Sequence, residues 1–507
     1  MGQQQIGAGG AERYYKDQTM DSMSESEPSA KISLIVSIEE CEGSKYSCKT
    51  FDVTTQTPKL INTPEEAMPD DKGVVRFQKT LIMEYYFEKD QQILISIDKT
   101  KDGSTQTLEF RTSVGNIVGS RHNTIIKRIN NIDPERLSIT AIEQKDNIEY
   151  LFLDFDVKTN KPLNFIEQRN FIYYLVEGQT PIYKSETISK DGRFNQTQIP
   201  LSLVNPTFTF TVFDCKQRPV AKVETSVEEF TTPNGTYKEI AFPLSKHRSI
   251  TLINKSTVRK PFTFIDYLKQ GAELELMVAI DFTGSNGSPD EPGSLHFIGP
   301  GFVNDYEKVI TSCGNIVAYY DYVKNFPVFG FGASLPGEDR TSFCFNMNSS
   351  DSPDIYSISG VLEVYHRKVM EVSFSGPTLL APVLSKTIDI IRNKHNKFKY
   401  HVLIILVDGN LNDTSDTKDL LVLGAKLPMS VIIIGIGNAN FSHMETLNNN
   451  PLVSSTGEQC VRNIVQFVPF SKFKNNQQRL AEEVLKKIPR QFLEYYTQNS
   501  IYPETLW

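Results

Sequence analysis

The stretch "ELELMVAIDFTGSNGSP", residues 273–289, passes from an apolar run to a polar turn within a few positions. The apolar half has the length and composition of a strand buried on both faces, which is typical of a parallel sheet covered by helices. Asp281 stands where this strand should end, and Thr283, Ser285 and two glycines follow it. In open α/β sheets, ligands bind beyond the carboxyl ends of the strands. The stretch therefore predicts both the fold of its domain and a polar site.

A second apolar run ends in a second acid. Asp408 follows "HVLIILV" in the sequence "VDGN", and the loop "FSGPT" carries Thr378 ahead of a helical segment. Because the carboxyl ends of parallel strands meet at one edge of a sheet, we expect these residues to lie beside Asp281. An Asp-Gly pair after a strand is often only a turn. Either motif alone is therefore weak, and the prediction depends on the whole set.

The expected site contains only oxygen ligands, which come from two carboxylates and three hydroxyls: Asp281, Thr283, Ser285, Thr378 and Asp408. In the D-x-T-x-S spacing, alternate residues leaving a strand point the same way, so its three oxygens can face one ion. Such a set suits a hard cation with octahedral preference, Mg²⁺ or Mn²⁺. Because hydroxyls carry no charge, the ion would still attract a carboxylate donated by a protein partner.

Residues 256–499 alternate strand-length apolar runs with helical segments, which predicts an α/β domain with a mostly parallel, Rossmann-like sheet. The other runs are "FPVFGFG", "MSVIIIGI" and "IVQFVPF". The domain closes with "RLAEEVLKKIPRQFLEYY", whose apolar residues fall on one helical stripe: Leu480, Val484, Ile488 and Phe492. We expect this stripe to pack on the sheet, and a helix lying on a membrane is the alternative.

Residues 30–145 and 146–255 have a different hydrophobic pattern. Short runs with period-two alternation, such as "KISLIVSI" and "TFTFTVFD", are separated by turn residues. This pattern predicts two tandem antiparallel β-sandwiches. Residues 1–29 are rich in Gln, Gly, Ser, Glu and Met, and we expect a flexible tail because they cannot bury enough apolar surface to become ordered.

The start of this tail contains a candidate lipidation site. Removal of Met1 from "MGQQQI" exposes Gly2, the residue at which N-myristoylation occurs. Ile6, however, stands where the motif favours Ser or Thr. An unmodified tail is therefore the favoured interpretation.

Composition excludes several functional classes. The 507 residues carry a net charge of -8, which argues against general nucleic-acid binding. Six cysteines are scattered without a C-x-x-C pair, so we expect reduced thiols and no zinc site. No stretch reaches the ~18 consecutive apolar residues of a membrane-spanning helix, and the beginning lacks the apolar core of a signal peptide. The sequence therefore predicts a cytoplasmic protein.

Taken in order, the motifs of residues 260–497 resemble the von Willebrand A domain with its metal-ion-dependent adhesion site, and more narrowly the A domain of the copine family. The likeness extends through "LHFIGPGFVNDYEKVI", "GVLEVYH", "GPTLLAPVL" and "LPMSVIIIGIGNANF". It implies that the five oxygen-bearing residues are metal ligands, Asp408 directly or through water. "TLL" after the Gly-Pro and Val407 before the acid depart from the usual copine pattern, but neither removes a ligand. Copines carry two C2-type sandwiches before this domain, in agreement with the alternating pattern of residues 30–145 and 146–255.

The resemblance also implies calcium-dependent phospholipid binding, in which loop aspartates at one tip of each sandwich hold Ca²⁺ against anionic headgroups. Most of these acids are missing here. The survivors are Asp98 and Asp102 in the first sandwich, whose two loops are expected at "CKTF" and "IDKT", and Asp214 in the second. Strong calcium binding is therefore not expected in either sandwich.

Four basic residues of the second sandwich would form a basic tip if its loops bring them together. Arg169 in "EQRNF" and Lys216 in "FDCK" occupy positions where the copine pattern has aspartates, and Arg218 and Lys222 follow. One interpretation is a basic tip that meets anionic lipid directly, with each cation contributing about 1 kcal/mol. The other interpretation is a solvated charged face.

Three functions compete on these grounds. The leading hypothesis is a copine-like peripheral-membrane adaptor in trafficking or signalling, which binds phospholipid through its sandwiches and recruits a protein through its metal. It would associate reversibly with the plasma membrane or endomembranes. The alternative is a soluble metal-dependent adaptor whose sandwiches have lost calcium and lipid binding. An enzyme is disfavoured, because Thr283 occupies the place of the second acid of a phosphatase-like motif and the seven histidines form no metal pair.

Overall fold

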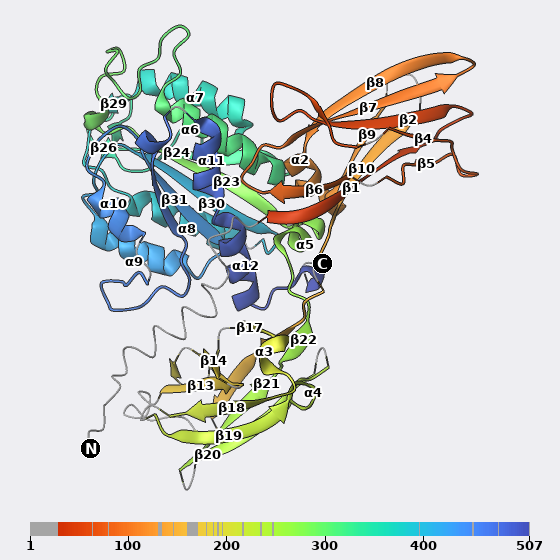
Figure 1. The fold of residues 1–507 in the computed structure, drawn as a ribbon. Coiled ribbons are helices and arrows are strands. Elements are labelled where there is room, and N and C mark those ends of the chain that lie inside the picture. The colour runs from red at the N-terminus through yellow and green to blue at the C-terminus, as the bar shows by residue number, and fades with distance from the viewer. Residues whose placement is uncertain are drawn as a thin grey trace, which may run out of the picture. The chain divides into compact units, whose positions relative to one another are not determined.

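The structure, a computed structural model, describes residues 29–505 except 63, 80, 130–133, 146, 160–170, 179, 186, 190–191, 195, 215–216, 234–235, 246–247, 395, 449–450 and 475. Two compact units are present (Figure 1). One combines residues 27–144 with 263–507, and the other contains residues 145–262. Among the described residues, no helix has both the length and the apolar character needed to cross a bilayer.

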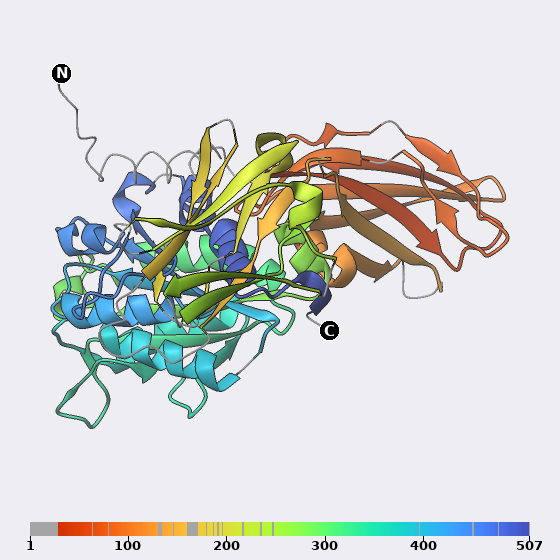
Figure 2. The same cartoon turned by 90° about the horizontal axis from the view of Figure 1, so that it is seen from below.

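The first antiparallel region, called here the first β-sandwich, consists of two sheets (red to orange in Figures 1 and 2). One sheet has the order β5–β1–β10–β9, with β6 also paired to β1: β5 (Val75–Arg76), β1 (Ser29–Glu39), β10 (Arg136–Glu143), β9 (Thr124–Arg128) and β6 (Leu81–Tyr86). The other has the order β3–β2–β7–β8, with β4 also on β2: β3 (Lys59–Leu60), β2 (Lys45–Asp52), β7 (Gln92–Lys101), β8 (Ser104–Ser113) and β4 (Glu65–Ala67).

Alternation along the strands builds the core of this sandwich. Ile32, Leu34 and Ile38 of β1 are buried, as are Ile95 and Ile97 of β7, because every second side chain of a strand points to the same face. After β8 the chain forms two short helices, α2 (Val114–Gly119) and the 3₁₀ helix η1 (Arg121–Asn123).

The second antiparallel region, called here the second β-sandwich, lies in the other unit and contains three antiparallel sheets. Their strands are β17 (Thr197–Pro200), β11 (Tyr150–Leu153) and β22 (Thr257–Arg259); β16 (Gly192–Arg193), β12 (Phe155–Thr159), β21 (Arg248–Asn254) and β20 (Lys238–Ser245); and β14 (Pro181–Lys184), β13 (Phe171–Glu177), β18 (Thr207–Phe213), β19 (Pro219–Ser226) and β15 (Ile188–Ser189). Two short helices, α3 (Leu201–Val204) and α4 (Val227–Phe230), join them. The core is strongly aromatic, with Phe155, Tyr174 and Phe210 in mutual ring contact.

The α/β domain, residues 263–505, contains the predicted parallel sheet. Its order is β27–β24–β23–β30–β31–β32: β27 (Phe345–Asn346), β24 (Asn325–Phe331), β23 (Glu273–Asp281), β30 (Lys399–Val407), β31 (Met429–Gly435) and β32 (Val465–Pro469). All neighbours from β24 to β32 pair in parallel. β27 and β28 (Asp354–Tyr356) join β24 in antiparallel fashion, an addition that the apolar runs did not indicate because these strands are very short.

Helices cover both faces of this sheet (Figure 1). One face packs against α8 (Ala381–Lys394) and α9 (Thr414–Gly424), whose Leu384 and Leu421 share a buried cluster with Met277. The other helices of the domain are α5 (Phe264–Lys269), α6 (Asp305–Val317), α7 (Ile358–Glu371), α10 (Ser442–Leu447), α11 (Gln477–Leu485) and α12 (Ile488–Gln498). Minor elements are β25 (Ala333–Ser334), β26 (Thr341–Ser342), β29 (Ser373–Phe374), η3 (Gly284–Asn286), η4 (Ala318–Tyr320), η5 (Phe470–Lys472) and η6 (Pro503–Thr505).

The C-terminal stripe is buried in the domain, as predicted, but it belongs to two helices. Leu480 and Val484 lie on α11, whereas Ile488 and Phe492 lie on α12, and all four are buried. The break falls just before Pro489, which occupies the first turn of α12. Proline lacks the backbone N–H that a continuous helix needs and is tolerated at a helix start.

Candidate metal site

Both predicted acids lie at the carboxyl edge of the parallel sheet. Asp281 is the last residue of β23, and Asp408 follows β30 directly. These strands are neighbours whose register places Ile280 opposite Leu406, so they end side by side. The backbone N–H of Asp408 donates to Asp281 Oδ2 at 3.4 Å, and both side chains are buried. The parallel pairing therefore brings together two carboxylates that are far apart in the sequence.

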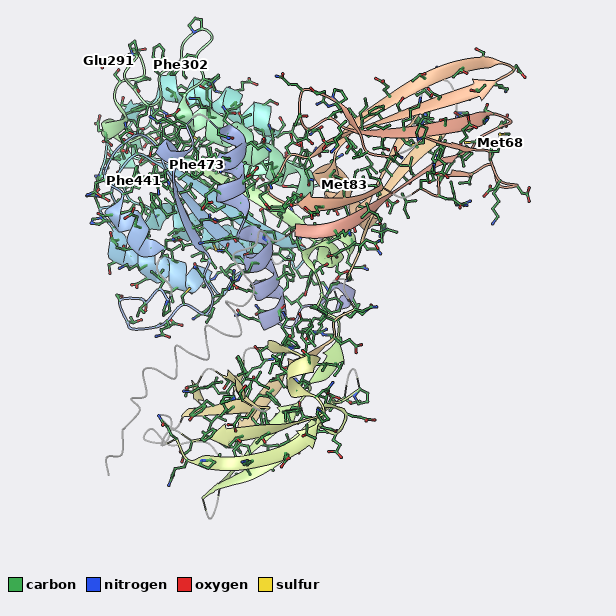
Figure 3. All side chains as sticks on the ribbon, in the orientation of Figure 1. Met68, Met83, Glu291, Phe302, Phe441 and Phe473 are labelled. Carbon is green, nitrogen blue, oxygen red and sulfur yellow. The ribbon has the colours of Figure 1, made fainter. Side chains whose placement is uncertain are left out.

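The loop after β23 adds two hydroxyls to this pair. Ser285 Oγ donates to Asp408 Oδ1 at 3.0 Å, and Thr283 Oγ1 donates to the same oxygen at 3.3 Å. The two hydroxyl oxygens are 3.1 Å apart. The loop is held back toward the strand by the N–H of Thr283, which donates to Asp281 Oδ1 at 2.8 Å. The hydroxyls of Thr283 and Ser285 thus converge on one oxygen of Asp408, beside Asp281. Farther along the same loop lie Glu291 and Phe302, which Figure 3 labels.

Thr378 reaches this edge through its backbone. Thr283 and Ser375 form a parallel bridge, which ties the loop before α8 to the loop after β23. The N–H of Thr378 donates to Asn412 Oδ1 at 3.1 Å, and the N–H of Asn412 donates to the Thr378 carbonyl at 3.0 Å. The Thr378 hydroxyl makes no hydrogen bond to either acid. Its segment is therefore anchored beside Asp408, while its hydroxyl has no partner among the described side chains of the site.

The electrostatics of the site are those of two buried like charges. Burial, and then the charge of Asp408, raise the pKa of Asp281 well above the usual carboxyl range. Burial also raises the pKa of Asp408. Among the described residues, neither acid pairs with Lys, Arg or His. Such a pair is costly in the ionised form unless a cation lies between the carboxylates.

The residues present therefore fit a bound divalent cation. Carboxylate and hydroxyl oxygens suit Mg²⁺ or Mn²⁺ better than the softer metals that thiolates select. The described residues contain no cluster of three or more His, Cys, Asp or Glu side chains that could hold a metal. This candidate site has only two such residues, and it depends on hydroxyls for the rest of its ligands.

A buried histidine behind the site was missed by sequence reasoning. His296 Nε2 lies 2.7 Å from the Asp281 carbonyl oxygen, and Nδ1 lies 2.8 Å from the Tyr365 hydroxyl. Burial lowers the pKa of His296 to about 3, so the ring is neutral. A carbonyl only accepts, so Nε2 donates and Nδ1 accepts from Tyr365. Both nitrogens are therefore occupied, and His296 supports the end of β23 rather than serving as a base.

Aromatic packing completes this support. The His296 ring stacks on Tyr306 with centroids 4.1 Å apart, and the Tyr306 hydroxyl donates to Asn286 Oδ1 at 2.7 Å. Asn304, the N-cap of α6, donates through Nδ2 to the Tyr365 hydroxyl at 3.0 Å. The only sequence signal for this role is a histidine in the apolar setting "SLHFI". That setting cannot reveal a contact with a residue on the preceding strand.

The acids predicted for the first β-sandwich lie elsewhere than expected. "CKTF" and "IDKT" belong to strands β2 and β7, so the prediction that they form loops is wrong there. Asp98 lies on the sheet surface, where it accepts from Lys49 Nζ at 3.0 Å and from Thr107 Oγ1 at 2.6 Å. These two hydrogen bonds lower the pKa of Asp98. Asp102 is exposed in the turn between β7 and β8. The structure does not bring these two acids into a common ligand set.

The acid predicted for the second β-sandwich is also engaged. Asp214 follows β18 and accepts hydrogen bonds from the backbone N–H, Nε and Nη2 of Arg218, at 2.9, 2.9 and 2.6 Å. One predicted acid and one predicted cation therefore neutralise each other, and Lys222 is exposed on β19. Arg169 and Lys216, like Gly2 in the predicted tail, lie outside the described residues.

The described chain thus contains several antiparallel sheets, followed by an α/β domain with a set of oxygen-bearing side chains at the edge of its parallel sheet. A family model described as "Copine" matches residues 294–504. Copine-B of Dictyostelium discoideum is 31% identical over 515 residues, covering 93% of this chain and 96% of that protein. Protein BONZAI 2 of Arabidopsis thaliana is 33% identical over 393 residues, covering 72% of this chain and 67% of that protein. The chain belongs to the copine family.

Solved structures are less similar. Proximal thread matrix protein 1 from the mussel byssus, with a zinc-occupied MIDAS motif, gives a TM-score of 0.26 at 16% identity, covering 43% of this chain and 46% of that chain. The two calcium-bound C2 domains of Extended-Synaptotagmin 2 give a TM-score of 0.17 at 9% identity, covering 46% of this chain and 98% of that chain. At these scores the two likenesses carry no argument about this chain.

Proposed function

We propose that this copine is an adaptor whose α/β domain, of von Willebrand A type, binds a protein partner through Mg²⁺ or Mn²⁺. The side chains that would hold the ion are Asp281, Thr283, Ser285, Thr378 and Asp408, the last directly or through water. A bound ion supplies an electrophilic centre that can accept a carboxylate from the partner. The chain's own hydroxyls leave the positive charge of that centre only partly neutralised.

One observation carries this proposal. Asp281 and Asp408 are buried together at the sheet edge, two hydroxyls lie 3.0 and 3.3 Å from the same Asp408 oxygen, and no side chain among the described residues neutralises the acids. A protein that needed only stability would gain by replacing one of these acids. A bound cation would account for the arrangement, because the attraction of each carboxylate to the cation outweighs the repulsion between the two carboxylates.

Isothermal titration calorimetry of the full chain with Mg²⁺ and Mn²⁺ tests the metal site. We expect saturable binding to the wild type and its loss in Asp281→Asn. The matched control is Asp389→Asn, which changes an exposed carboxylate of α8, and it should bind as the wild type does. Absence of binding to the wild type, or equal binding to all three proteins, would refute the proposal.

The second half of the proposal concerns membranes. The two β-sandwiches, taken as C2-type domains, would associate reversibly with anionic phospholipid at the cytoplasmic face of the plasma membrane or of endomembranes. The α/β domain would then recruit its partner there for trafficking or signalling. This part is supported by family membership and by the antiparallel architecture of residues 29–143 and 150–259.

A specific observation favours the alternative, a metal-dependent adaptor that works in solution. Two of the acids that the sequence offers as calcium ligands are already paired, Asp98 with Lys49 and Asp214 with Arg218. A carboxylate in an ion pair must lose that partner before it can bind Ca²⁺, which weakens calcium binding. If lipid binding persists, we expect it to be independent of calcium.

Co-sedimentation with phosphatidylserine–phosphatidylcholine vesicles, in calcium and in chelator, separates these possibilities. Equal sedimentation in both conditions supports direct binding of anionic lipid, and no sedimentation in either supports the soluble adaptor. Sedimentation only with calcium would contradict the inference from the paired acids. Vesicles of phosphatidylcholine alone serve as the control for charge.

The proposed role is binding rather than catalysis. The histidine beside the candidate site has both ring nitrogens engaged, so it is not available for proton transfer to a substrate. Steady hydrolysis of p-nitrophenyl phosphate by the wild type, abolished in Asp281→Asn and retained in Asp389→Asn, would contradict this part of the proposal.

A further inference from the structure

The segment "AYYDY", residues 318–322, follows α6 in the α/β domain and contains three tyrosines. Each of them contacts a different part of the first β-sandwich, which belongs to the same compact unit. The contacts join residues more than a hundred positions apart in the sequence. We call this segment, together with the Phe264 side chain of α5, the docking segment.

The centre of the contact is a buried pair of phenols. The hydroxyls of Tyr85 on β6 and Tyr320 form a hydrogen bond, and both side chains are almost completely buried. A buried phenol hydroxyl needs a partner, because leaving it unpaired costs the free energy of its lost hydration. Each tyrosine therefore satisfies the other across the junction between the two domains.

Aromatic rings surround these phenols. Phe87 of the sandwich lies 4.8 Å from the Tyr320 ring and 5.4 Å from the Phe264 ring, measured between centroids. Phe264 in turn contacts Phe492 of α12 at 5.0 Å. The junction is thus continuous with the core of the α/β domain. Without the α/β domain, the Phe87 ring of the sandwich would lose these contacts and be exposed to solvent.

Two glycines allow the backbones to approach closely. Gly115 and Gly119 are four residues apart on α2, so they share one helical face. A Cβ on Gly115 would lie 2.9 Å from the Tyr319 ring, and one on Gly119 would collide with the Tyr319 carbonyl oxygen. Neither glycine has a positive φ, so their own backbone conformation does not require glycine. The close approach of Tyr319 does.

Polar contacts line the edge of the junction. The Tyr319 hydroxyl donates to Asp90 Oδ1 at 3.0 Å, and the Arg121 guanidinium lies 5.3 Å from the centroid of the Tyr322 ring. An apolar, desolvated centre with a polar edge is typical of stable interfaces, whereas domains that move freely share small polar contacts.

We propose that the docking segment locks the first β-sandwich to the α/β domain, so that the two open and unfold as one cooperative unit. Any surface that the first β-sandwich engages is then rigidly connected to the candidate metal site. The second β-sandwich forms a separate compact unit and takes no part in this lock. The proposal does not depend on metal binding.

A double-mutant cycle on the full chain tests the central contact. The variants are Tyr85→Phe, Tyr320→Phe and the double substitution, and hydrogen exchange read by mass spectrometry gives the opening equilibrium of residues 93–97 and 402–406. We expect each single variant to raise the opening constant by roughly threefold to tenfold, since it leaves one buried hydroxyl unpaired. The double variant should show less than the product of the two effects. Strictly multiplicative effects would mean that the hydroxyls do not meet in solution and would overturn the proposal.

Cooperativity is tested in the same experiment. In the wild type, residues 93–97 of the sandwich and 402–406 of the α/β domain should share one opening constant, whereas separate constants would refute the lock. Gly119→Ala should break the shared constant and increase exchange at residues 114–119 and 318–322. The matched control, Gly293→Ala, changes a glycine with open space around its Cβ and should leave exchange unchanged. Unaltered exchange in Gly119→Ala would contradict the proposal.

Discussion

At the scale of single residues, the candidate site contains a pair of acids that suits metal binding but destabilises the metal-free fold. The ionised form of each acid, Asp281 or Asp408, would be more favourable if the other acid were neutral. Burial and mutual repulsion disfavour two negative charges so close together. Ser285 and Thr283 donate to Asp408 without cancelling its charge. The metal-free site therefore holds a proton more readily than an ordinary carboxyl pair.

The first prediction is that the effect of Asp281→Asn on the free energy of unfolding changes sign when Mg²⁺ is added. In chelator at neutral pH, Asp281→Asn should raise the free energy of unfolding by about 1–2 kcal/mol, because a neutral amide of similar volume removes the cost of keeping this buried carboxyl protonated. With excess Mg²⁺ the order should reverse, since only the wild type gains from the ion. Chemical denaturation in both conditions measures this. A variant less stable than the wild type in chelator would contradict the electrostatic account.

The second prediction concerns pH. A carboxyl whose pKa is raised by folding stabilises the folded state at low pH, and this contribution is lost as pH rises toward the raised value. The metal-free wild type should therefore lose stability, relative to Asp281→Asn, from about pH 4 up to the raised pKa of Asp281. Denaturation at a series of pH values in chelator measures the difference. A difference that does not change with pH would show that Asp281 does not titrate as inferred.

At the scale of elements, the site depends on how closely β24 approaches the loop after β23. Gly332 follows β24 with a φ of +79°, and a Cβ there would collide with the Thr283 methyl group. His296, farther along the same loop, donates to the Asp281 carbonyl at the end of β23. The position of the hydroxyl ligands is therefore set by neighbouring elements as well as by their own loop.

The third prediction compares two glycines that have similar positive φ angles. Gly332→Ala should weaken Mg²⁺ binding by about 10- to 100-fold, the range found when residues that support metal ligands are changed. Gly337→Ala introduces a similar backbone strain, at a φ of +82°, but has nothing within 4 Å of its Cβ. It should lose stability and keep its affinity. Calorimetric titration of both variants with Mg²⁺ measures their affinities. Equal Mg²⁺ affinities of the two variants would refute the role assigned to Gly332.

At the scale of the whole molecule, the chain contains two compact units of different composition. The larger combines the first β-sandwich with the α/β domain, and the smaller is the second β-sandwich with its own aromatic core. A unit with its own core can unfold separately, and a ligand stabilises only the unit that binds it.

The fourth prediction follows from this division. Differential scanning calorimetry of the full chain should give two transitions, and Mg²⁺ should shift only one of them upward, by several degrees. The shifted transition should report the α/β domain together with the first β-sandwich, which limited proteolysis at intermediate temperatures can identify. In Asp281→Asn neither transition should move with Mg²⁺. A single transition, or a shift of both transitions in the wild type, would contradict this division.

Much of the α/β domain could be predicted from local patterns. Apolar runs such as "HVLIILV" predict strands buried on both faces, and the D-x-T-x-S spacing predicts three oxygens on one side of a loop, because both depend on residues close in sequence. The family resemblance, which places "IDKT" in a loop, was wrong there, because strand β7 continues through these residues.

The sequence by itself determined the long buried strands of the parallel sheet and which side chains could ligate a hard cation, because these follow from short-range periodicity and from the chemistry of each residue. Only the tertiary structure decided that Asp98 and Asp214 are paired with cations, that His296 supports Asp281, and that three tyrosines meet the first β-sandwich. Each of these depends on a side chain brought close by folding. Such contacts leave no periodic trace along the chain.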